Sequence, residues 1–339
     1  MKILFVGSLW KGSTGLHRLT ALQDLGHSVH ELDVTPKHKP YLLARTLRYL
    51  GFQLDIANIN GLILDAAQKD KFDFIWVDKV LEISPDTLNA IKLQLPNCKL
   101  IFYSPDDMMI AGNQTRHYRA CLPVYDLHVT TKSYNVHELK TLGAQEVFFV
   151  DNAYDTYTHR PLTMTNEEKA QWGADVGFIG GSEPERSETM LRLAEAGISV
   201  TIRGPGWESY REKHPNLIVE PGWVNGDDYA RSICATKINL GFLRKVARDK
   251  QTTRSIEIPA CGGFMLAERT DEHMRLFVEG KEAEFFGDFD ELLKKVQYYL
   301  AHDQEREQIA AAGYRRCLES GYSNHNRLKV ILEHINTLS

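Results

Sequence analysis

Short apolar segments alternate with helical segments along most of this chain, and this alternation limits the folds open to it. In the first part of the sequence the apolar segments are typical of buried strands, with helices expected between them, as at 62–69 and 84–95. Strands that alternate with helices form βαβ units with a parallel sheet. The pattern therefore predicts an α/β protein. The first expected strands are residues 2–7, 28–34, 72–78, 100–104, 127–131 and 147–151.

The strand–helix pattern is interrupted once and then begins again. Residues 154–172 are polar and irregular, which indicates a linker. A strand at 175–180, a Gly-Ser turn, a helix and a strand at 198–203 follow. Because 339 residues are too many for one typical core, we expect two domains. The expected bounds are 1–155 for a first Rossmann-like domain, 156–322 for a second, and 323–339 for a C-terminal helix that crosses back to the first.

Charge and cysteine content argue against several classes of protein. The net charge is −5 and gives no general attraction to nucleic acid. Five cysteines without a C-x-x-C pair argue against a disulfide framework and against a zinc site. The apolar opening, residues 3–6, is too short for a signal peptide or a membrane span. We therefore expect a cytoplasmic protein.

The first strand runs into a Gly-rich turn over residues 7–15. The turn resembles the phosphate-binding pattern G-x-x-x-x-G-K-[ST], but Ser13 stands where that pattern requires Lys. NTP hydrolysis is therefore not expected. The glycines are also spaced more widely than in the dinucleotide fingerprint. A turn in which glycines allow close backbone packing explains Gly12 as well as a ligand does.

One stretch of the second half, residues 249–266, combines two carboxylates with a helix start. It follows a strand-like run at 238–243 and contains a short helix closed by two glycines before the next strand. A helix entered from the carboxyl end of a buried strand directs its first N–H groups at the place where α/β proteins bind ligands. Asp249 and Glu257 are therefore expected to lie beside one ligand.

A second helix start follows the strand at 175–180. Ser182 and Glu185 have the spacing of a capping box, and Arg186 lies one turn into the helix. Unpaired amides at such a turn suit a diphosphate, and Arg186 would add a full charge. The alternative is a surface Arg186 paired with Glu183 or Glu185. The candidate phosphate-binding residues are Gly180, Gly181, Ser182 and Arg186.

Two further motifs have plainer explanations. Asp288 and Asp290 imitate a metal-binding Asp-x-Asp motif, but they precede a helix whose N-terminus they would cap. No metal is therefore expected. The segment 41–50 has an apolar face beside Arg45 and Arg48, which suits either an anionic membrane surface or acceptor, or a helix packed on its own domain. Contact with a membrane is expected to be peripheral at most.

The carboxylate stretch resembles a known signature. An acidic residue, seven intervening residues and then Glu on a short helix resemble the donor-binding signature of retaining GT-B glycosyltransferases. The downstream sequence resembles more closely the glycosyltransferase-like family of CgeB-type spore-maturation proteins. Asp249 departs from the commoner pattern, which has Glu there. The segments that carry the second resemblance are 277–280, 286–288, 290–292, 298–300 and 312–313, together with 126–153 and the segment around Gly180.

The resemblance implies a fold and an activity. GT-B proteins have two Rossmann-like domains facing across a cleft, with the donor on the second and the acceptor on the first. The implied reaction moves a sugar from a nucleotide-sugar, expected to be UDP-linked, to a hydroxyl of an unknown glycan, lipid, protein or small molecule. It is expected to proceed with retention and without a cofactor. A nucleotide-sugar epimerase and a non-catalytic sugar-nucleotide-binding or surface-layer protein are the alternatives.

The resemblance also implies roles for single residues. Asp249 would act on the donor sugar and Glu257 on the ribose, while Arg203 and Trp223 lie on loops that would hold the nucleotide; a packed structural Trp223 is equally compatible. On the acceptor side it implies Gly12, Ser13 and His117, with Asp106 as a catalytic group, although Ser-Pro-Asp-Asp is also an ordinary turn. The cations considered for the diphosphate are Arg186, Arg244, Lys245, Arg248 and Arg254.

Overall fold

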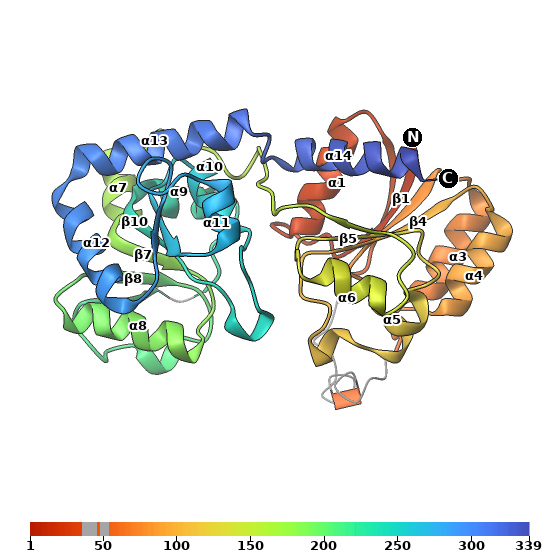
Figure 1. Cartoon of the computed structure of the whole chain (residues 1–339), viewed down its shortest axis with the longest axis horizontal. Coiled ribbons are helices and arrows are strands. Elements are labelled where there is room, and N and C mark those ends of the chain that lie inside the picture. Colours follow the sequence, from red (N-terminus) through yellow and green to blue (C-terminus); the bar gives the residue numbers. More distant parts are fainter. Residues whose placement is uncertain (36–45, 48–53, 221, 339) are drawn as a thin grey trace. The chain divides into compact units, whose positions relative to one another are not determined.

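A computed structural model of the chain describes residues 1–35, 46–47, 54–220 and 222–338. It divides into two compact units (Figure 1). Unit 1 consists of Met1–Asp151 and Asn324–Ser339, and unit 2 of Asn152–Ser323. The proposed amphipathic segment with Arg45 and Arg48 lies outside the described residues, apart from residues 46–47.

Unit 1 is built on a six-stranded parallel sheet with the order β2-β1-β3-β4-β5-β6. The strand order reverses between β1 and β3, and the carboxyl edge of a parallel sheet at such a point is where α/β proteins bind ligands. The turns after β1 and β3 therefore lie side by side. The strands are β1 (Lys2–Gly7), β2 (Ser28–Asp33), β3 (Phe74–Asp78), β4 (Lys99–Ser104), β5 (Leu127–Thr130) and β6 (Val147–Phe149).

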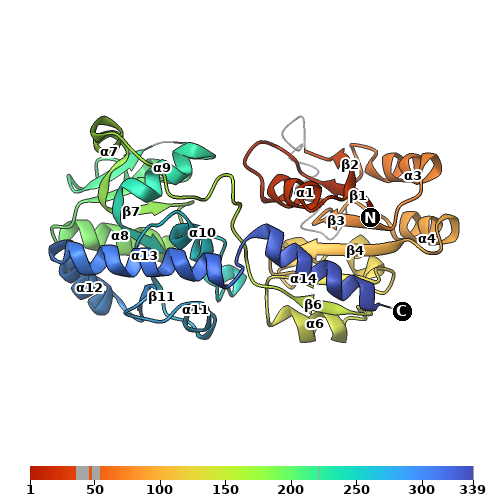
Figure 2. The ribbon, with the colours of Figure 1, turned by 90° about the horizontal axis from the view of Figure 1, so that it is seen from above.

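Helices cover both faces of this sheet because successive side chains of β1 point to opposite faces. Ile3 and Phe5 pack in the core under two adjacent helices, α1 (Thr14–Asp24) and α14 (Asn324–Thr337), which lie side by side (Figure 2). Leu4 and Val6 pack on the other face. That face is covered by α3 (Ile59–Lys69), α4 (Pro85–Gln94), α5 (Arg116–Cys121) and α6 (Asn135–Thr141).

Unit 2 has a second six-stranded parallel sheet, with the order β12-β11-β10-β7-β8-β9. Its order reverses between β7 and β10, so the turns that follow these two strands are neighbours at the carboxyl edge. This topology brings the Gly180 turn beside the segment that leads from β10 to Glu257. The strands are β7 (Ala174–Ile179), β8 (Val200–Arg203), β9 (Leu217–Glu220), β10 (Thr236–Gly241), β11 (Met265–Glu268) and β12 (Glu284–Phe286).

The helices of unit 2 also form two layers. One core contains Leu266 and lies beneath α8 (Pro184–Glu195) and α12 (Phe289–Ala301). The other contains Met265 and Ala267, on the opposite face of β11. It is covered by α9 (Asp227–Ala235), α10 (Arg254–Ala260), α11 (Asp271–Leu276) and α13 (Asp303–Glu319), while α7 (Asn166–Trp172) packs on α9.

The parallel α/β architecture predicted from the sequence is confirmed, but two local predictions are wrong. Residues 154–172 are not an irregular linker, because α7 lies within them and is held by a capping box between Thr165 and Glu168. The N-cap of α8 is Glu183, without a side-chain cap. Ser182 does not cap this helix, because its hydroxyl bonds to the Ser187 hydroxyl at 2.7 Å.

Among the described residues, no helix combines the length and the apolar character that spanning a bilayer requires.

The β5 residue His128 makes the stability of unit 1 depend on pH. Burial among Phe102 and Tyr125 lowers the pKa of His128 from its usual 6.5 to about 4, and its Nε2 donates to the Leu122 carbonyl at 3.2 Å. The unfolded chain binds this proton more readily, so the stabilisation is complete above pH 6.5 and is lost as pH falls toward 4. We expect a loss of about 3 kcal/mol in unit 1 over that window.

Native-state hydrogen exchange in β4 and β5 measures this loss. A His128→Phe variant, which has no proton to bind, is expected to lose less stability over the same window. An equal loss in both proteins would contradict the assignment to His128.

Candidate functional site

Hydrogen bonds join the turn after β7 to the turn after β8. Gly180 N–H donates to the Arg203 carbonyl at 2.9 Å, and Ser182 N–H donates to the Pro205 carbonyl at 3.0 Å. The buried Trp207 indole donates to the Gly180 carbonyl at 2.8 Å. Two amides of this turn are therefore already paired, which corrects the expectation that they are open to a diphosphate. An anion at this turn would have to be bound by side chains or by the other amides of the segment.

Two arginines supply positive charge at this turn. The Arg186 Nη1 donates to the Gly181 carbonyl at 2.6 Å, and its guanidinium lies 5.0 Å from the Phe178 ring centroid. The guanidinium of Arg254, at the start of α10, lies 6.0 Å from the same centroid. A Cβ added to Gly180 would be 3.2 Å from Arg254 Nη2. Both guanidiniums therefore border the Gly180 turn.

The positive charge of this pair is not fully balanced. Burial lowers the pKa of Arg186, and the nearby charge of Arg254 lowers it further. Glu183 is the one carboxylate in ion-pair range of Arg186 among the described residues, at 3.7 Å, and it also pairs with Arg244 at 3.2 Å. The Nε atoms of Arg186 and Arg254 are buried without a hydrogen-bond partner. Two guanidiniums in this state are chemically suited to binding an anion.

The burial of Arg186 bears on the alternative interpretation of it. Its exposed fraction is 7%, so it is not a surface residue, although it lies 3.7 Å from Glu183, a pairing that the alternative expects. Arg254 forms no ion pair with any described residue. It is the first residue of α10, at the end of the segment that connects β10 to this helix. The two cations therefore border the same turn from two different helices, α8 and α10.

The segment from Asp249 to Glu257 ends in α10, which is closed by Cys261 as C-cap and by Gly262 at φ +74°. The N-cap and the first turn of α11 hold this segment through three hydrogen bonds. Asp249 itself is half-buried, and its N–H donates to the Arg244 carbonyl at 3.2 Å. The contacts with α11 are Thr270 Oγ1 to the Lys250 carbonyl (2.7 Å), Gln251 Nε2 to Glu272 (2.8 Å) and Ser255 Oγ to His273 Nε2 (2.7 Å).

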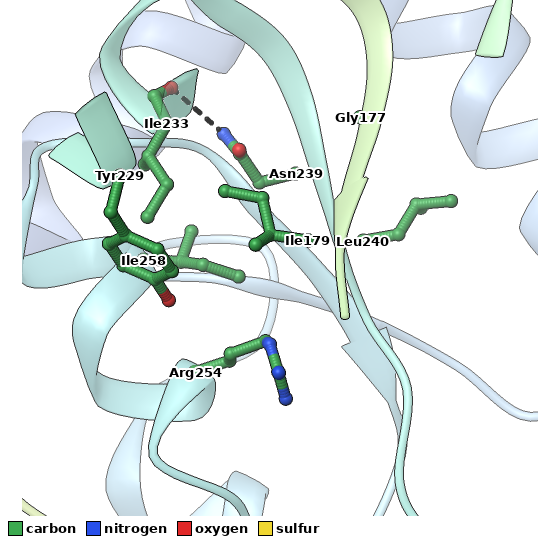
Figure 3. A pocket seen from close by; sticks show the side chains of 8 residues that line it. All are labelled: Gly177, Ile179, Tyr229, Ile233, Asn239, Leu240, Arg254 and Ile258. Carbon is green, nitrogen blue, oxygen red and sulfur yellow. Dashed lines mark hydrogen bonds between the residues drawn. The ribbon is translucent and has the colours of Figure 1, made fainter. Parts of the chain in front are cut away.

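Glu257 lies on α10 and is mostly buried, with 7% exposed. Its Oε2 accepts a hydrogen bond from the Tyr229 hydroxyl at 2.6 Å, and its Oε1 is 3.7 Å from His159 Nε2. Tyr229 also borders a cavity of about 10 Å³, the size of a single water. Figure 3 shows the Tyr229 hydroxyl directed toward the side of this cavity where Arg254 lies.

The other residues proposed for the donor have protein partners or high exposure. Arg203 is buried and donates two hydrogen bonds to Glu220, at 2.6 and 3.0 Å. Lys245 pairs with Glu268 at 2.6 Å. Trp223 is 70% exposed and is therefore not a packed core residue. Arg248 has a left-handed backbone, with φ +51°.

The acceptor-side residues lie at the carboxyl edge of unit 1. Ser13 caps α1, because its hydroxyl donates to the Ser8 carbonyl at 2.9 Å and accepts from Leu16 N–H at 3.1 Å. Gly12 adopts φ +92°, as a tight turn requires. Asp106 pairs with Lys79. The structure gives the His117 ring a buried Nδ1 without a hydrogen-bond partner.

Sequence reasoning missed a buried ion pair at this edge. Arg18 donates to both Asp78 carboxylate oxygens at 2.7 Å, and its guanidinium lies 4.3 Å from the Tyr103 ring centroid. Burial is the largest single effect and lowers the pKa of Arg18, but the charges and hydrogen bonds of Asp78 and Tyr103 together outweigh it, so the pKa is raised. The pair joins α1, which follows β1, to the last residue of β3, at the point where the strand order reverses. No local signal predicts it, because its members are far apart in the chain.

The described residues contain no group of three or more His, Cys, Asp or Glu side chains that could hold a metal ion. Asp288 is the N-cap of α12 and accepts from Glu291 N–H at 2.9 Å. The cap interpretation of the Asp-x-Asp motif thus accounts for Asp288.

Comparison with known proteins adds to this geometry. Residues 186–333, which include α10 and Glu257, match the model of a family described as glycosyl transferase-like. The chain carries a glycosyltransferase-like domain. It is also distantly similar to the spore protein CgeB of Bacillus subtilis (strain 168), with 25% identity over 190 residues. This match covers 51% of the present chain and 57% of CgeB.

Solved structures with the same fold cover the whole chain. A sucrose-phosphate synthase from Thermosynechococcus elongatus superposes with a TM-score of 0.63 at 13% identity, over 100% of both chains. Anabaena HepE in complex with UDP and glucose gives 0.64 at 12%, again over 100% of both chains. A glycosyltransferase from Rickettsia africae gives 0.65 at 11%, over 100% of this chain and 99% of that one. The GT-B fold predicted from the sequence is confirmed.

Proposed function

We propose that this glycosyltransferase-like chain transfers a sugar from a nucleotide-sugar, held by unit 2, to an acceptor hydroxyl. The observation that carries the proposal is the pair of guanidiniums at the Gly180 turn, whose buried Nε atoms have no hydrogen-bond partner. A diphosphate supplies the negative charge and the acceptor oxygens that this pair requires. HepE, which has the same fold, has been solved with UDP-glucose, which supports UDP as the nucleotide.

The proposed reaction proceeds with retention and needs no protein nucleophile. The bond from the anomeric carbon to the diphosphate oxygen breaks, and the acceptor oxygen bonds to the same face of that carbon. The leaving phosphate oxygen takes the acceptor proton. Arg186 and Arg254 stabilise the charge that develops on the diphosphate. Asp249 orients the ring hydroxyls and stabilises positive charge at the anomeric carbon.

On the acceptor side, Asp106 is the proposed catalytic group, and His117, Gly12 and Ser13 are the proposed contact residues.

Arg254→Ala and Arg186→Ala each test the diphosphate site. Each is expected to weaken nucleoside diphosphate binding by about tenfold to a hundredfold, because a hydrogen bond to a charged group contributes about 1.5–3 kcal/mol. Binding of the bare nucleoside should change little. Isothermal titration calorimetry with both ligands measures the difference.

Arg192→Ala is the matched control, because Arg192 lies on the same helix but stacks on Phe289 instead of facing the turn. Its affinities should equal those of the wild type. Equal diphosphate affinity in all four proteins would remove the proposed site.

Treatment with EDTA is expected to leave transfer activity unchanged, because the proposed charge stabilisation comes from Arg186 and Arg254. Initial rates with and without chelator, in a buffer free of divalent cations, test this. Loss of activity that manganese restores would show that a metal ion carries this role.

A further inference from the structure

We propose that His273 is a positioning residue that fixes the turn carrying Arg254, so that the Arg254 guanidinium is held at the Gly180 turn for the donor diphosphate. The inference rests on the proposed function, in which Arg254 binds this diphosphate. His273 lies on α11 and acts through Ser255, without contact to the donor.

Both hydrogen bonds of the His273 ring have one possible direction. A carbonyl only accepts, so Nδ1–H donates to the Glu268 carbonyl, 2.7 Å away. In the neutral ring Nε2 is then an acceptor, and the Ser255 hydroxyl donates to it at 2.7 Å. Burial lowers the pKa of His273 from its usual 6.5, although the Glu268 carbonyl and the charges of Glu268 and Glu272 raise it. The ring is therefore neutral near pH 7, and Nε2 stays an acceptor.

Two further contacts fix the position of this ring. It stacks on Phe285, with centroids 5.6 Å apart and an angle of 9° between the planes. The His273 N–H donates to Oγ1 of Thr270, the N-cap of α11, at 3.0 Å. The ring is completely buried, and Glu268, to which it donates, is the last residue of β11, a neighbour of β10 in the sheet. The sheet therefore sets the position of Nε2.

Ser255 links the ring to the turn that contains Arg254. Its Oγ accepts from Thr252 N–H at 3.0 Å, and its own N–H donates to the Thr252 carbonyl at 3.1 Å. These bonds join the two ends of the segment 252–255, with Arg254 between them. Ser255 is buried and its hydroxyl both donates and accepts, so Ser255 and His273 are not a nucleophile and base open to a substrate.

Arg254 depends on its backbone for its position. No carboxylate of the described residues pairs with it, and its Nε is buried without a hydrogen-bond partner. Its Nη2 would nevertheless be only 3.2 Å from a Cβ added to Gly180. Because no ion pair anchors this side chain, a shift of the segment 252–255 would move the guanidinium away from the Gly180 turn. A cation that is in place before the ligand arrives loses less conformational entropy on binding.

Ser255→Ala removes the link and tests it in the full chain. A panel of nucleoside diphosphates, beginning with UDP, first identifies one that binds, and calorimetry then compares it with its bare nucleoside. Ser255→Ala should weaken diphosphate binding by about tenfold and leave nucleoside binding unchanged. In an Arg254→Ala background the same substitution should change diphosphate affinity by less than about threefold, because no guanidinium remains to be positioned. General damage to unit 2 would instead weaken binding in both backgrounds.

A pair of His273 variants tests the ring itself. His273→Leu and His273→Gln both lose the stacking on Phe285, but only the Gln side chain carries an acceptor oxygen for the Ser255 hydroxyl. His273→Leu should weaken diphosphate binding about as much as Ser255→Ala, and His273→Gln should retain most of the wild-type affinity.

Ser232→Ala is the matched control. Ser232 is also a buried serine of unit 2, but its hydroxyl donates to the Asp228 carbonyl of its own helix at 2.8 Å. This variant should bind the diphosphate as the wild type does.

Wild-type diphosphate affinity in Ser255→Ala or in His273→Leu would overturn the inference. So would an equal loss with and without Arg254, or equal affinities of the Leu and Gln variants of His273. The proposed function survives each of these results if Arg254→Ala still weakens diphosphate binding. If no nucleoside diphosphate binds to the wild type, the proposed function itself is wrong, and this inference with it.

Discussion

Replacing Asp249 with Asn is expected to lower kcat by about a hundredfold to a thousandfold, as removal of one group that stabilises transition-state charge does. The donor dissociation constant should change little. Asp249 precedes α10 in a segment that α11 holds in place, so the amide should occupy the same position without the charge. An interaction stronger in the transition state than in the ground state appears in kcat.

Two further variants make this result specific. Glu257→Gln is expected to raise the donor KM more than it lowers kcat, because the family resemblance implies that Glu257 binds the donor ribose. Asp271→Asn removes an exposed carboxylate of α11 that pairs with Lys250 at 3.0 Å, and should leave both constants near those of the wild type. Wild-type kinetics in folded Asp249→Asn and Glu257→Gln would contradict the donor-site assignment. An inverted product anomer would contradict retention alone.

Gly204→Ala is expected to destabilise unit 2 by about 4 kcal/mol and to lower its Tm by about 10 °C. A Cβ at this position would lie 2.2 Å from the Gly180 carbonyl oxygen, which Trp207 also holds. The contact is with backbone, so no side-chain rotation relieves it. Gly204 also has φ +155°, which side chains rarely adopt. Differential scanning calorimetry measures the change.

Gly181→Ala is the matched control in the same interlocked turns. A Cβ there would meet only ordinary contacts, with the Pro205 carbonyl at 3.8 Å as the nearest. Its Tm should stay near that of the wild type. If the turn borders the diphosphate as proposed, Gly181→Ala should still weaken diphosphate binding. Equal Tm values for the two variants would contradict the close approach of Gly204 to Gly180.

The regular alternation of strands and helices was sufficient to predict the fold class. The short helix before Gly262 was also predicted, because a polar segment, a short apolar run and two glycines are local signals. A signal for α7 is also present, in the capping box of Thr165 and Glu168, but the polar residues around it are equally typical of a linker. Local signals therefore predict elements well and their ends less well.

The site was only partly predictable, because its chemistry depends on partners far apart in sequence. Two amides of the Gly180 turn donate to the carbonyls of Arg203 and Pro205, at and after the end of β8. The sequence predicts these amides to be available to a ligand, and in the structure they are not. Arg203 is paired with Glu220 on the next strand, and Tyr229 reaches Glu257 from α9. Strand order and helix packing produce these pairings, and no spacing within one segment encodes them.

Unit 2 is proposed to bind a nucleotide-sugar through the two guanidiniums at the Gly180 turn. The most direct test is a thermal-shift titration of the wild type and of Arg254→Ala with nucleotide-sugars, beginning with UDP-glucose. A donor at a hundred times its Kd stabilises by about 2.7 kcal/mol, and the Tm of the wild type should rise by about 5–10 °C. Arg254→Ala should keep the same Tm without ligand and show a much smaller rise. The absence of a shift with every donor, or an equal shift in both proteins, would contradict the claim.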